Sequence, residues 1–392
     1  MDKRLTLLFA LAGGAAVGNL YWSQPLLDFI ARDLRTGTGA AGWLVTATQL
    51  GYALGIFLFV PLGDLVDRRR LVPLALLCST AALVICAVSS TFPVLLAALA
   101  LVGLTTVSGQ ILVPLAGDLA DDATRGRVVG TVVSGILIGI LASRTVSGLI
   151  AGIAGWRAIY LLAAAFSLTL AVVLYRRIPT LPPRTDLRYP ALLASVFAII
   201  ARHRSIRWSL VLGGLSFGVF TMFWTALTFL LSAPPFSFPV TVVGLFGLVG
   251  LAGAIAAQRA GRLHDRGLGL PGMGIAWAGV VLAFAVAALG SRSVAVIIVA
   301  ILLLDIAIQG HNILLQSRMF VVEPAARSRI NTAFVTNNFL CGAVGSALAG
   351  FLWSHGGWRS VSIAGIALSA IALGVWQAGR RGPLKVAAPT TS

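Results

Sequence analysis

The chain consists of long apolar stretches separated by short polar loops that are rich in arginine, glycine and proline. A helix of about 20 apolar residues crosses the ~30 Å hydrocarbon core of a bilayer. Continuous apolar runs, rather than short alternating strands, favour helices over a barrel. We therefore predict a membrane-spanning helix for each of twelve stretches: residues 5–30, 40–62, 71–90, 93–116, 128–153, 157–175, 208–232, 240–258, 271–290, 294–316, 330–353 and 359–378.

The second half of the chain repeats the first. Three short motifs recur at a spacing of 202 residues: Tyr21-Trp22 matches Phe223-Trp224, Arg125-Gly126-Arg127 matches Arg327-Ser328-Arg329, and Trp156-Arg157 matches Trp358-Arg359. This pattern predicts an all-α membrane protein whose twelve transmembrane helices form two pseudo-symmetric six-helix halves. Two such halves are typical of transporters that rock around a central site.

One long polar interruption, residues 176–207, separates the halves. It opens with prolines, and residues 189–203 have the pattern of an amphipathic helix lying on the inner membrane surface. The predicted organisation is a six-helix bundle over 1–175, a cytoplasmic linker over 176–207, a second six-helix bundle over 208–378 and a cytoplasmic tail over 379–392. The other loops are too short to hold a soluble catalytic domain.

Composition and charge support a membrane protein with a defined orientation. The residues are 58% hydrophobic and 10% charged, which is more apolar surface than a soluble core could bury. Most of the 29 lysines and arginines fall in alternate loops, including both ends and the linker. By the positive-inside rule, both termini are then cytoplasmic. The net charge of +17 therefore reflects topology, and we expect no nucleic-acid partner.

The residues that support enzyme chemistry are scarce and scattered. The three cysteines lie within predicted spans, and the four histidines form no group with acids or thiols. We therefore expect no metal site, no cofactor and no enzyme activity. No Walker loop is present, so ATP hydrolysis is not expected to drive the protein. The internal repeat disfavours a receptor or a channel.

The loops after the second predicted span of each half share a Gly-x-Leu-x-Asp-Arg core. The residues are Gly63, Asp67 and Arg68 in the first half, and Gly261, Asp265 and Arg266 in the second. This core resembles the signature loop of the major facilitator superfamily, although the first copy is shorter than the family pattern. Together with the twelve spans and the repeat, the resemblance to this family covers the whole chain. The resemblance implies that these loops gate the inward-closed state. The alternative is a solvated charged turn.

The resemblance extends to two further features near the predicted fifth span of each half. Arg125, Arg127, Arg327 and Arg329 are placed as repeat-related clamps on the inner side, with Asp121, Asp122 and Glu323 as their nearest acids. The predicted span 128–153 is rich in glycine, which resembles the fifth-helix motif of the family's antiporters, although it lacks their Gly-Pro pair. Generic close helix packing is the alternative for these glycines.

A carboxyl group stands near the middle of the predicted tenth span. A charge at the bilayer centre costs about 2.5 kcal/mol or more on insertion scales, so Asp305 is a candidate functional residue. Gln309, Asn312 and Gln316 continue one stripe along the same helix. In the family this helix lines the cavity. Asp305 is therefore expected to couple transport to protons or to bind a cationic substrate, and the alternative is a structural hydrogen bond or ion pair.

Other polar residues within spans could carry the substrate. Arg144 is expected to pair with Asp28 as a structural ion pair, and binding of an anionic substrate is the alternative. Amides from several helices are hard to dismiss, because each needs a partner or a wet cavity. The candidate cavity residues are Asn19, Tyr21, Trp22, Gln24, Gln49, Tyr52, Gln110, Trp224, Gln309, Asn312 and Asn338.

These features together predict a secondary transporter. The chain most resembles the twelve-span drug:proton antiporter branch, which implies export of a small organic compound in exchange for protons. A sugar or metabolite carrier of the same fold, in either direction, is the alternative. The expected partners are a small-molecule substrate, protons and membrane lipid, and we expect a monomer.

Overall fold

The structure, a computed structural model, describes residues 1–180, 182, 188–257, 268–323 and 326–385, with the backbone alone for residues 251–257. Contacts divide the chain into two compact units. The first contains Met1–Leu192 and Ser237–Leu248, and the second contains Leu193–Phe236 and Val249–Ser392. Every regular element among the described residues is a helix.

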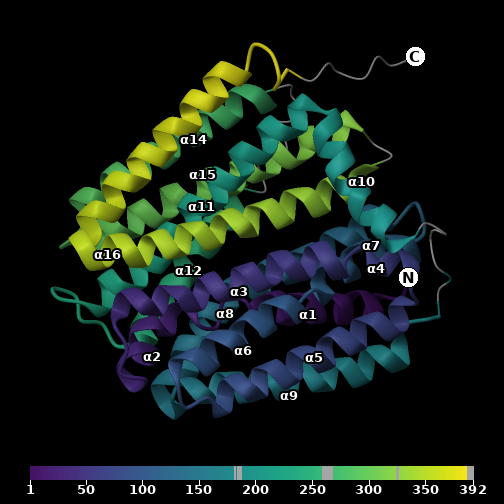
Figure 1. The fold of residues 1–392 in the computed structure, drawn as a ribbon, viewed down its shortest axis with the longest axis horizontal. Helices are drawn as coiled ribbons and strands as arrows, with labels where there is room; N and C mark the ends of the chain where they lie inside the picture. Colours follow the sequence, from purple (N-terminus) through teal and green to yellow (C-terminus); the bar gives the residue numbers. More distant parts are fainter. Residues whose placement is uncertain (181, 183–187, 258–267, 324–325, 386–392) are drawn as a thin grey trace. The chain divides into compact units, whose positions relative to one another are not determined.

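The first unit follows the order of the predicted first half. In Figure 1 its long helices run alongside one another in purple and blue. Its elements are α1 (Lys3–Gly18), η1 (Gln24–Leu26), α2 (Leu27–Asp33), α3 (Thr38–Phe59), α4 (Leu62–Leu65), α5 (Arg68–Val88), α6 (Phe92–Thr105), α7 (Ser108–Leu119), α8 (Arg125–Ala154) and α9 (Trp156–Arg177).

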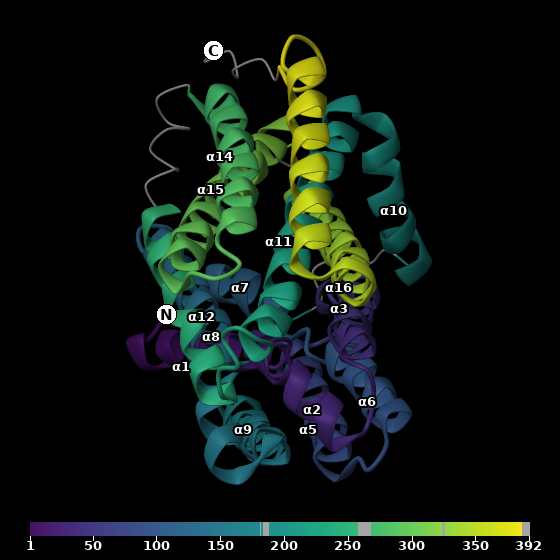
Figure 2. The same cartoon turned by 90° about the vertical axis from the view of Figure 1, so that its left-hand side faces the viewer.

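The second unit contains the remaining long helices, seen from the side in Figure 2. They are α11 (Arg204–Ser232), α14 (Gly269–Leu289), α15 (Val294–Val322) and α16 (Arg327–Gly379). Two helices contribute residues to both units, α10 (Tyr189–Arg202) and α12 (Val240–Ala257).

Each predicted span overlaps a helix, but the boundaries differ in informative ways. Among the described residues, nine helices are long and apolar enough to cross a membrane. The predicted span 5–30 is interrupted, because α1 ends at Gly18 and α2 begins at Leu27. Two predicted spans, 330–353 and 359–378, lie in the single helix α16. The helix α12 covers Val240–Ala257 within the predicted span 240–258. A count of twelve spans stays a prediction, because the nine helices are counted among the described residues only.

Glycine makes the sharp turns that end the fifth span of each half. Gly155 separates α8 from α9 with φ of +81°, and Gly357 bends α16 with φ of +59°. Side chains with a Cβ rarely adopt this conformation, so glycine is needed at both positions. Figure 1 shows the two legs of α16 meeting at this turn. The repeat therefore includes the backbone geometry and not only the neighbouring Trp-Arg pairs.

A cluster around Asp33 fastens three helix ends in the first unit. Its carboxylate accepts hydrogen bonds from Trp156 Nε1 at 2.9 Å and Arg157 Nη1 at 2.8 Å, and Arg157 Nη2 donates to the Ser89 carbonyl oxygen at 3.0 Å. The bond from Trp156, followed by that from Arg157, holds the pKa of Asp33 below its ordinary value. The ionised Asp33 therefore stabilises the fold at neutral pH, and this stabilisation is lost as the pH falls through the folded pKa of Asp33. Because the Asp33 side chain is 41% exposed, we expect this effect to be small.

The first and fifth helices of each half pack through glycine. A Cβ on Gly139 of α8 would overlap the backbone of Gly14 in α1, and a Cβ on Gly345 of α16 would overlap the backbone of Gly218 in α11. Small residues let helix backbones approach closely in a membrane, where packing rather than the hydrophobic effect drives association. Gly139, in the glycine-rich span 128–153, thus packs closely against the first helix, and Gly345 makes the corresponding contact in the second half.

The start of α12 packs on a second glycine surface of α8. A Cβ on Gly148 would lie 2.8 Å from the Gly244 Cα atom, and Thr145 Oγ1 donates to the Gly244 carbonyl oxygen at 3.1 Å. A Cβ on Gly130, in contrast, would meet no atom of a neighbouring described element within 4 Å. The glycines of α8 therefore serve two neighbouring helices, and Gly130 serves neither.

Candidate functional site

The break between α1 and α2 brings polar side chains into the interior of the first unit. Pro25 has no N–H group, so it cannot donate to the Tyr21 carbonyl oxygen as a continuous α-helix would require, and it lies instead in the 3₁₀ helix η1. One backbone carbonyl freed by the break is satisfied by a neighbouring helix, since Ser147 Oγ on α8 donates to the Trp22 carbonyl oxygen at 2.6 Å. Trp22 Nε1 donates to Asn19 Oδ1 at 2.8 Å. Non-helical backbone at membrane depth is tolerated only where it is buried in protein or lines a cavity.

Arg144 on α8 lies against this break. Its Nε donates to Gln24 Oε1 at 2.7 Å, and its guanidinium carbon lies 5.0 Å from the centre of the Tyr21 ring. The expected pair of Arg144 with Asp28 is wrong: Asp28 pairs with Arg32 at 2.7 Å, one turn along α2. The helical break explains the difference, because a continuous helix would have placed Gln24 and Asp28 on one face.

A second polar contact in the first unit joins α3 to α7. Gln110 Nε2 donates to the Tyr52 hydroxyl oxygen at 3.2 Å. Tyr52 and the neighbouring Gln49 are both buried. In addition, Nδ2 of Asn19 is a buried donor without a hydrogen-bond partner among the described residues. These groups could bind the polar part of a small molecule.

Asp305 lies inside the second unit on α15. It is 11 residues from the start of the helix, about 17 Å along the axis at ~1.5 Å per residue. Its side chain is buried, and Oδ1 accepts a hydrogen bond from Trp224 Nε1 on α11 at 3.2 Å. Trp224 is the repeat mate of Trp22, so both indoles donate to a polar side chain of their own unit. An acid at this depth can bind and release a proton or hold a cation.

The rest of the polar stripe on α15 has mixed surroundings. Asn312 Oδ1 accepts from Ser216 Oγ at 3.3 Å, and Gln316 Nε2 donates to Asn331 Oδ1 at 3.0 Å. The half-buried amide of Gln309 has no hydrogen-bond partner within the part of the chain that is described. His311 is off the stripe and packs against Trp277, with ring centres 5.1 Å apart.

Asn338, the last candidate in this unit, lies on α16. With its amide oriented to satisfy both groups, its nitrogen donates to the carbonyl oxygens of Gly213 at 3.1 Å and Phe334 at 3.3 Å. This pairing fixes α16 against α11, as does the neighbouring bond from Asn337 Nδ2 to the Leu210 carbonyl oxygen at 2.7 Å. The Asn338 amide therefore has a structural role in this geometry.

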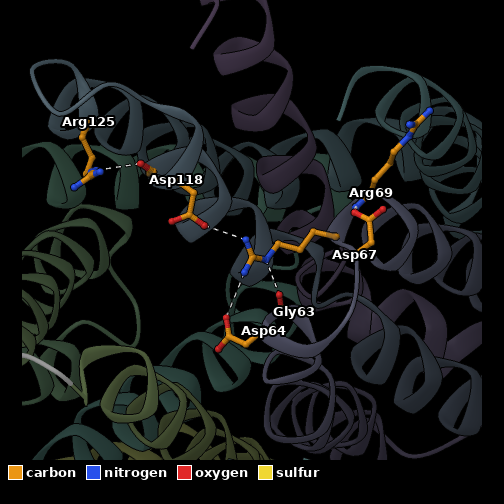
Figure 3. A network of polar contacts seen from close by, with 8 residues as sticks. Gly63, Asp64, Asp67, Arg69, Asp118 and Arg125 are labelled. Carbon is orange, nitrogen blue, oxygen red and sulfur yellow. Dashed lines mark hydrogen bonds and ion pairs between the residues drawn. The ribbon is translucent and has the colours of Figure 1, made fainter. Parts of the chain in front are cut away.

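The signature loop of the first half is organised around Arg68, which is buried. Figure 3 shows the surrounding residues Gly63, Asp64 and Asp118. Its Nε donates to the Gly63 carbonyl oxygen at 2.6 Å, and its guanidinium pairs with Asp118 on α7 at 3.0 Å and with Asp64 at 3.4 Å. We call this group of four residues the Arg68 network. The sequence motif predicts a gating position for Arg68 but does not single out Asp118, whose only signal is an acid at the end of an apolar run.

The other gating candidates differ in their surroundings. Asp67 begins α5 as its N-cap, with Oδ1 accepting from the backbone N–H of Arg69 at 2.9 Å. Arg125 pairs with the exposed Asp122 at 2.9 Å, and the expected acid Glu323 binds His203 at 2.7 Å instead. No hydrogen bond or ion pair of their side chains is found within the described residues for Arg127, Arg327 and Arg329. Gly261, Asp265 and Arg266 lie outside the described residues.

The chain matches a known family over most of its length. Residues 8–345 match the model of the Major Facilitator Superfamily, so the chain belongs to this family of transporters, as the signature loop and the repeat had indicated. It is a multi-pass membrane protein with the helical fold of that family.

Two bacterial relatives are similar to the chain in sequence, and one solved structure is similar to it in fold. It is 41% identical to the putative uncharacterized transporter YgaY of Escherichia coli (strain K12), over 97% of this chain and 96% of the relative. It is 33% identical to the probable transporter SCO4007 of Streptomyces coelicolor, over 90% of this chain and 82% of the relative. A crystal structure of a mutant of the nucleoside transporter NupG has a TM-score of 0.78 at 16% identity, covering 95% of this chain and 99% of that one.

Proposed function

We propose that this transporter exports a small organic compound in exchange for protons, by alternating access around a central site. The observation that carries the proposal is the buried carboxyl of Asp305, bonded to Trp224 and placed far from either end of an apolar helix. A group there must exchange protons or cations with one side of the membrane at a time if the two halves open alternately. The close glycine packing of α8 is consistent with an antiporter.

A test of this proposal separates coupling from binding. Asp305→Asn keeps the volume of the side chain and removes its titratable group. We expect the variant, reconstituted in proteoliposomes, to lose at least about tenfold in accumulation driven by a pH gradient, while exchange of substrate without a gradient stays within about twofold. Asp28→Asn, which changes an acid paired with Arg32, is the matched control and should retain both activities.

If Asp305→Asn still concentrates substrate with only a proton gradient supplied, Asp305 is not the coupling residue. The carboxyl would then serve as a substrate contact or as a packing group. The substrate itself can be found from the thermal stabilisation of the purified protein across a panel of compounds.

A second candidate is a carrier of a hydroxyl-rich metabolite. The half-buried amide of Gln309 and the buried donor of Asn19 favour it, because amides bind hydroxyl groups well. Stabilisation by sugars or nucleosides, without stabilisation by apolar amines, would support this candidate over drug export.

We further propose that both termini and the linker 176–207 face the cytoplasm of a bacterial inner membrane. The concentration of arginine and lysine in alternate loops supports this orientation. A reporter that is active only in the cytoplasm should be active when fused after residue 385. Activity of a periplasmic reporter at the same position would reverse the topology.

A further inference from the structure

A charged groove lies between α1 and α9 in the first unit, away from the polar residues described above. It has a volume of about 290 Å³, just below the ~300–1,000 Å³ range of small-molecule sites. Its lining is amphipathic: Leu5, Leu8 and Val173 are apolar, and Asp2, Arg4 and Arg177 are charged. The groove lies where α1 begins and α9 ends, which we call the basic end of these helices.

The charged groups of the groove are available to a ligand. Within the described residues, the side chains of Arg4, Arg177 and Asp2 make no hydrogen bond or ion pair. The lining of the groove therefore holds two cations and one carboxylate, and Lys3 and Arg176 are further cations next to the two arginines in sequence. Such a surplus of positive charge favours an anionic ligand over a neutral or zwitterionic one.

The surface of the same two helices indicates lipid rather than a soluble anion. Leu7 and Leu11 on α1 are 54% and 53% exposed, and Val172 on α9 is 45% exposed. Exposed leucine and valine on membrane-spanning helices are expected to face acyl chains. A ligand in the groove would therefore meet hydrocarbon beside it and charged groups at its head. Basic pockets between membrane helices are known to suit lipid headgroups.

We propose that this groove binds the headgroup of an anionic phospholipid of the phosphatidylglycerol type. The phosphodiester oxygens accept hydrogen bonds from the guanidinium groups of Arg4 and Arg177. These hydrogen bonds are strong because both partners are charged. A headgroup hydroxyl donates to the carboxylate of Asp2, which accepts from no donor among the described residues. The upper part of an acyl chain contacts Leu5, Leu8 and Val173.

The test measures lipid binding to purified protein in detergent by native mass spectrometry, with phosphatidylglycerol, phosphatidylethanolamine and inorganic phosphate as separate probes. The double variant Arg4→Gln/Arg177→Gln should weaken phosphatidylglycerol binding by about tenfold or more, because two charge-assisted hydrogen bonds are lost. The matched control is Lys3→Gln/Arg176→Gln, which removes the same charge from the same helix ends but not from the lining of the groove. It should change binding by less than about threefold.

A further variant tests the apolar part without changing charge. Val173→Trp fills the groove and should displace phosphatidylglycerol while the protein keeps its melting temperature in lipid-free detergent. This variant also keeps the proposal testable if the double variant does not fold.

Three results would overturn the proposal. Equal weakening by the two double variants would indicate a diffuse basic surface. Equal binding of phosphatidylethanolamine and phosphatidylglycerol to the unmodified protein would remove the selectivity for anionic lipid. Full displacement of the lipid by millimolar inorganic phosphate would show that the site takes a soluble anion.

Discussion

At the scale of single residues, the sequence identifies the important groups better than it identifies their partners. Asp305 and Arg144 stand out because charges are rare in spans, and both are buried. Their contacts could not be read from spacing: Trp224 and Gln24 come from other helices, and the pairing depends on where α1 breaks. Asp118 was missed for the same reason, since only the fold brings it to Arg68.

The contacts of Arg144 lead to a prediction on stability. Arg144→Ala leaves the buried Gln24 oxygen without its donor and removes the cation from the face of the Tyr21 ring. We expect a loss of about 1–3 kcal/mol, measured as a lower melting temperature or a lower denaturant midpoint in detergent. Asp28→Ala breaks only a pair with the largely exposed Arg32, so it should cost about 0–1 kcal/mol.

A larger loss of stability for Asp28→Ala than for Arg144→Ala would contradict this prediction and support the Arg144–Asp28 ion pair that the sequence suggested. An Arg144→Ala protein of normal stability that has lost only substrate affinity would instead make Arg144 a binding residue for an anionic substrate.

At the scale of elements, hydropathy predicts where helices lie but not where they break. Each apolar run overlaps at least one helix, because length and composition decide whether a segment can be buried in lipid. Pro25 was a visible signal for the break after α1, yet the apolar run continues through it. Helix α6 ends at Thr105 and α7 begins at Ser108, and the sequence signal for this break is weaker. It consists of Thr105 and Thr106, whose hydroxyl groups both lie near the Ser79 hydroxyl.

The glycines of α8 give an element-scale prediction with an internal control. Gly139→Ala places a methyl group against the backbone of Gly14, which cannot move aside as a side chain could. We expect α1 and α8 to separate and the melting temperature to fall by an amount corresponding to about 1–3 kcal/mol. Gly130→Ala on the same helix meets no described neighbour within 4 Å, so it should leave stability unchanged or raise it by about 0.5–1 kcal/mol. Equal effects of both substitutions would show that helix propensity, and not close packing, is being measured.

At the scale of the whole molecule, the internal repeat was the strongest prediction from the sequence. It extends to the turns at Gly155 and Gly357 and to the tryptophans that follow them. Trp358 Nε1 donates to the Ala287 carbonyl oxygen at 2.8 Å, whereas Trp156 Nε1 donates to Asp33 at 2.9 Å. The two halves thus keep the same donor and differ in its acceptor, a distinction that the repeated Trp-Arg motif does not encode.

The Arg68 network yields the prediction that concerns the transport cycle. Asp67 is a poor residue for testing a latch, because its replacement also removes the N-cap of α5, at a cost of about 0.5–2 kcal/mol. Asp118→Asn is cleaner: it removes the ion pair at 3.0 Å from the buried guanidinium of Arg68 and keeps the size of the side chain. If the loop stabilises one state of the alternating cycle, the variant should lower the transport rate at least about tenfold while substrate affinity stays within about twofold.

Asp122→Asn, on an exposed acid paired with Arg125, is the control and should transport normally. A normal transport rate for Asp118→Asn, measured beside this control in proteoliposomes, would reduce the signature loop to a charged turn that shapes the end of α5 and does not gate.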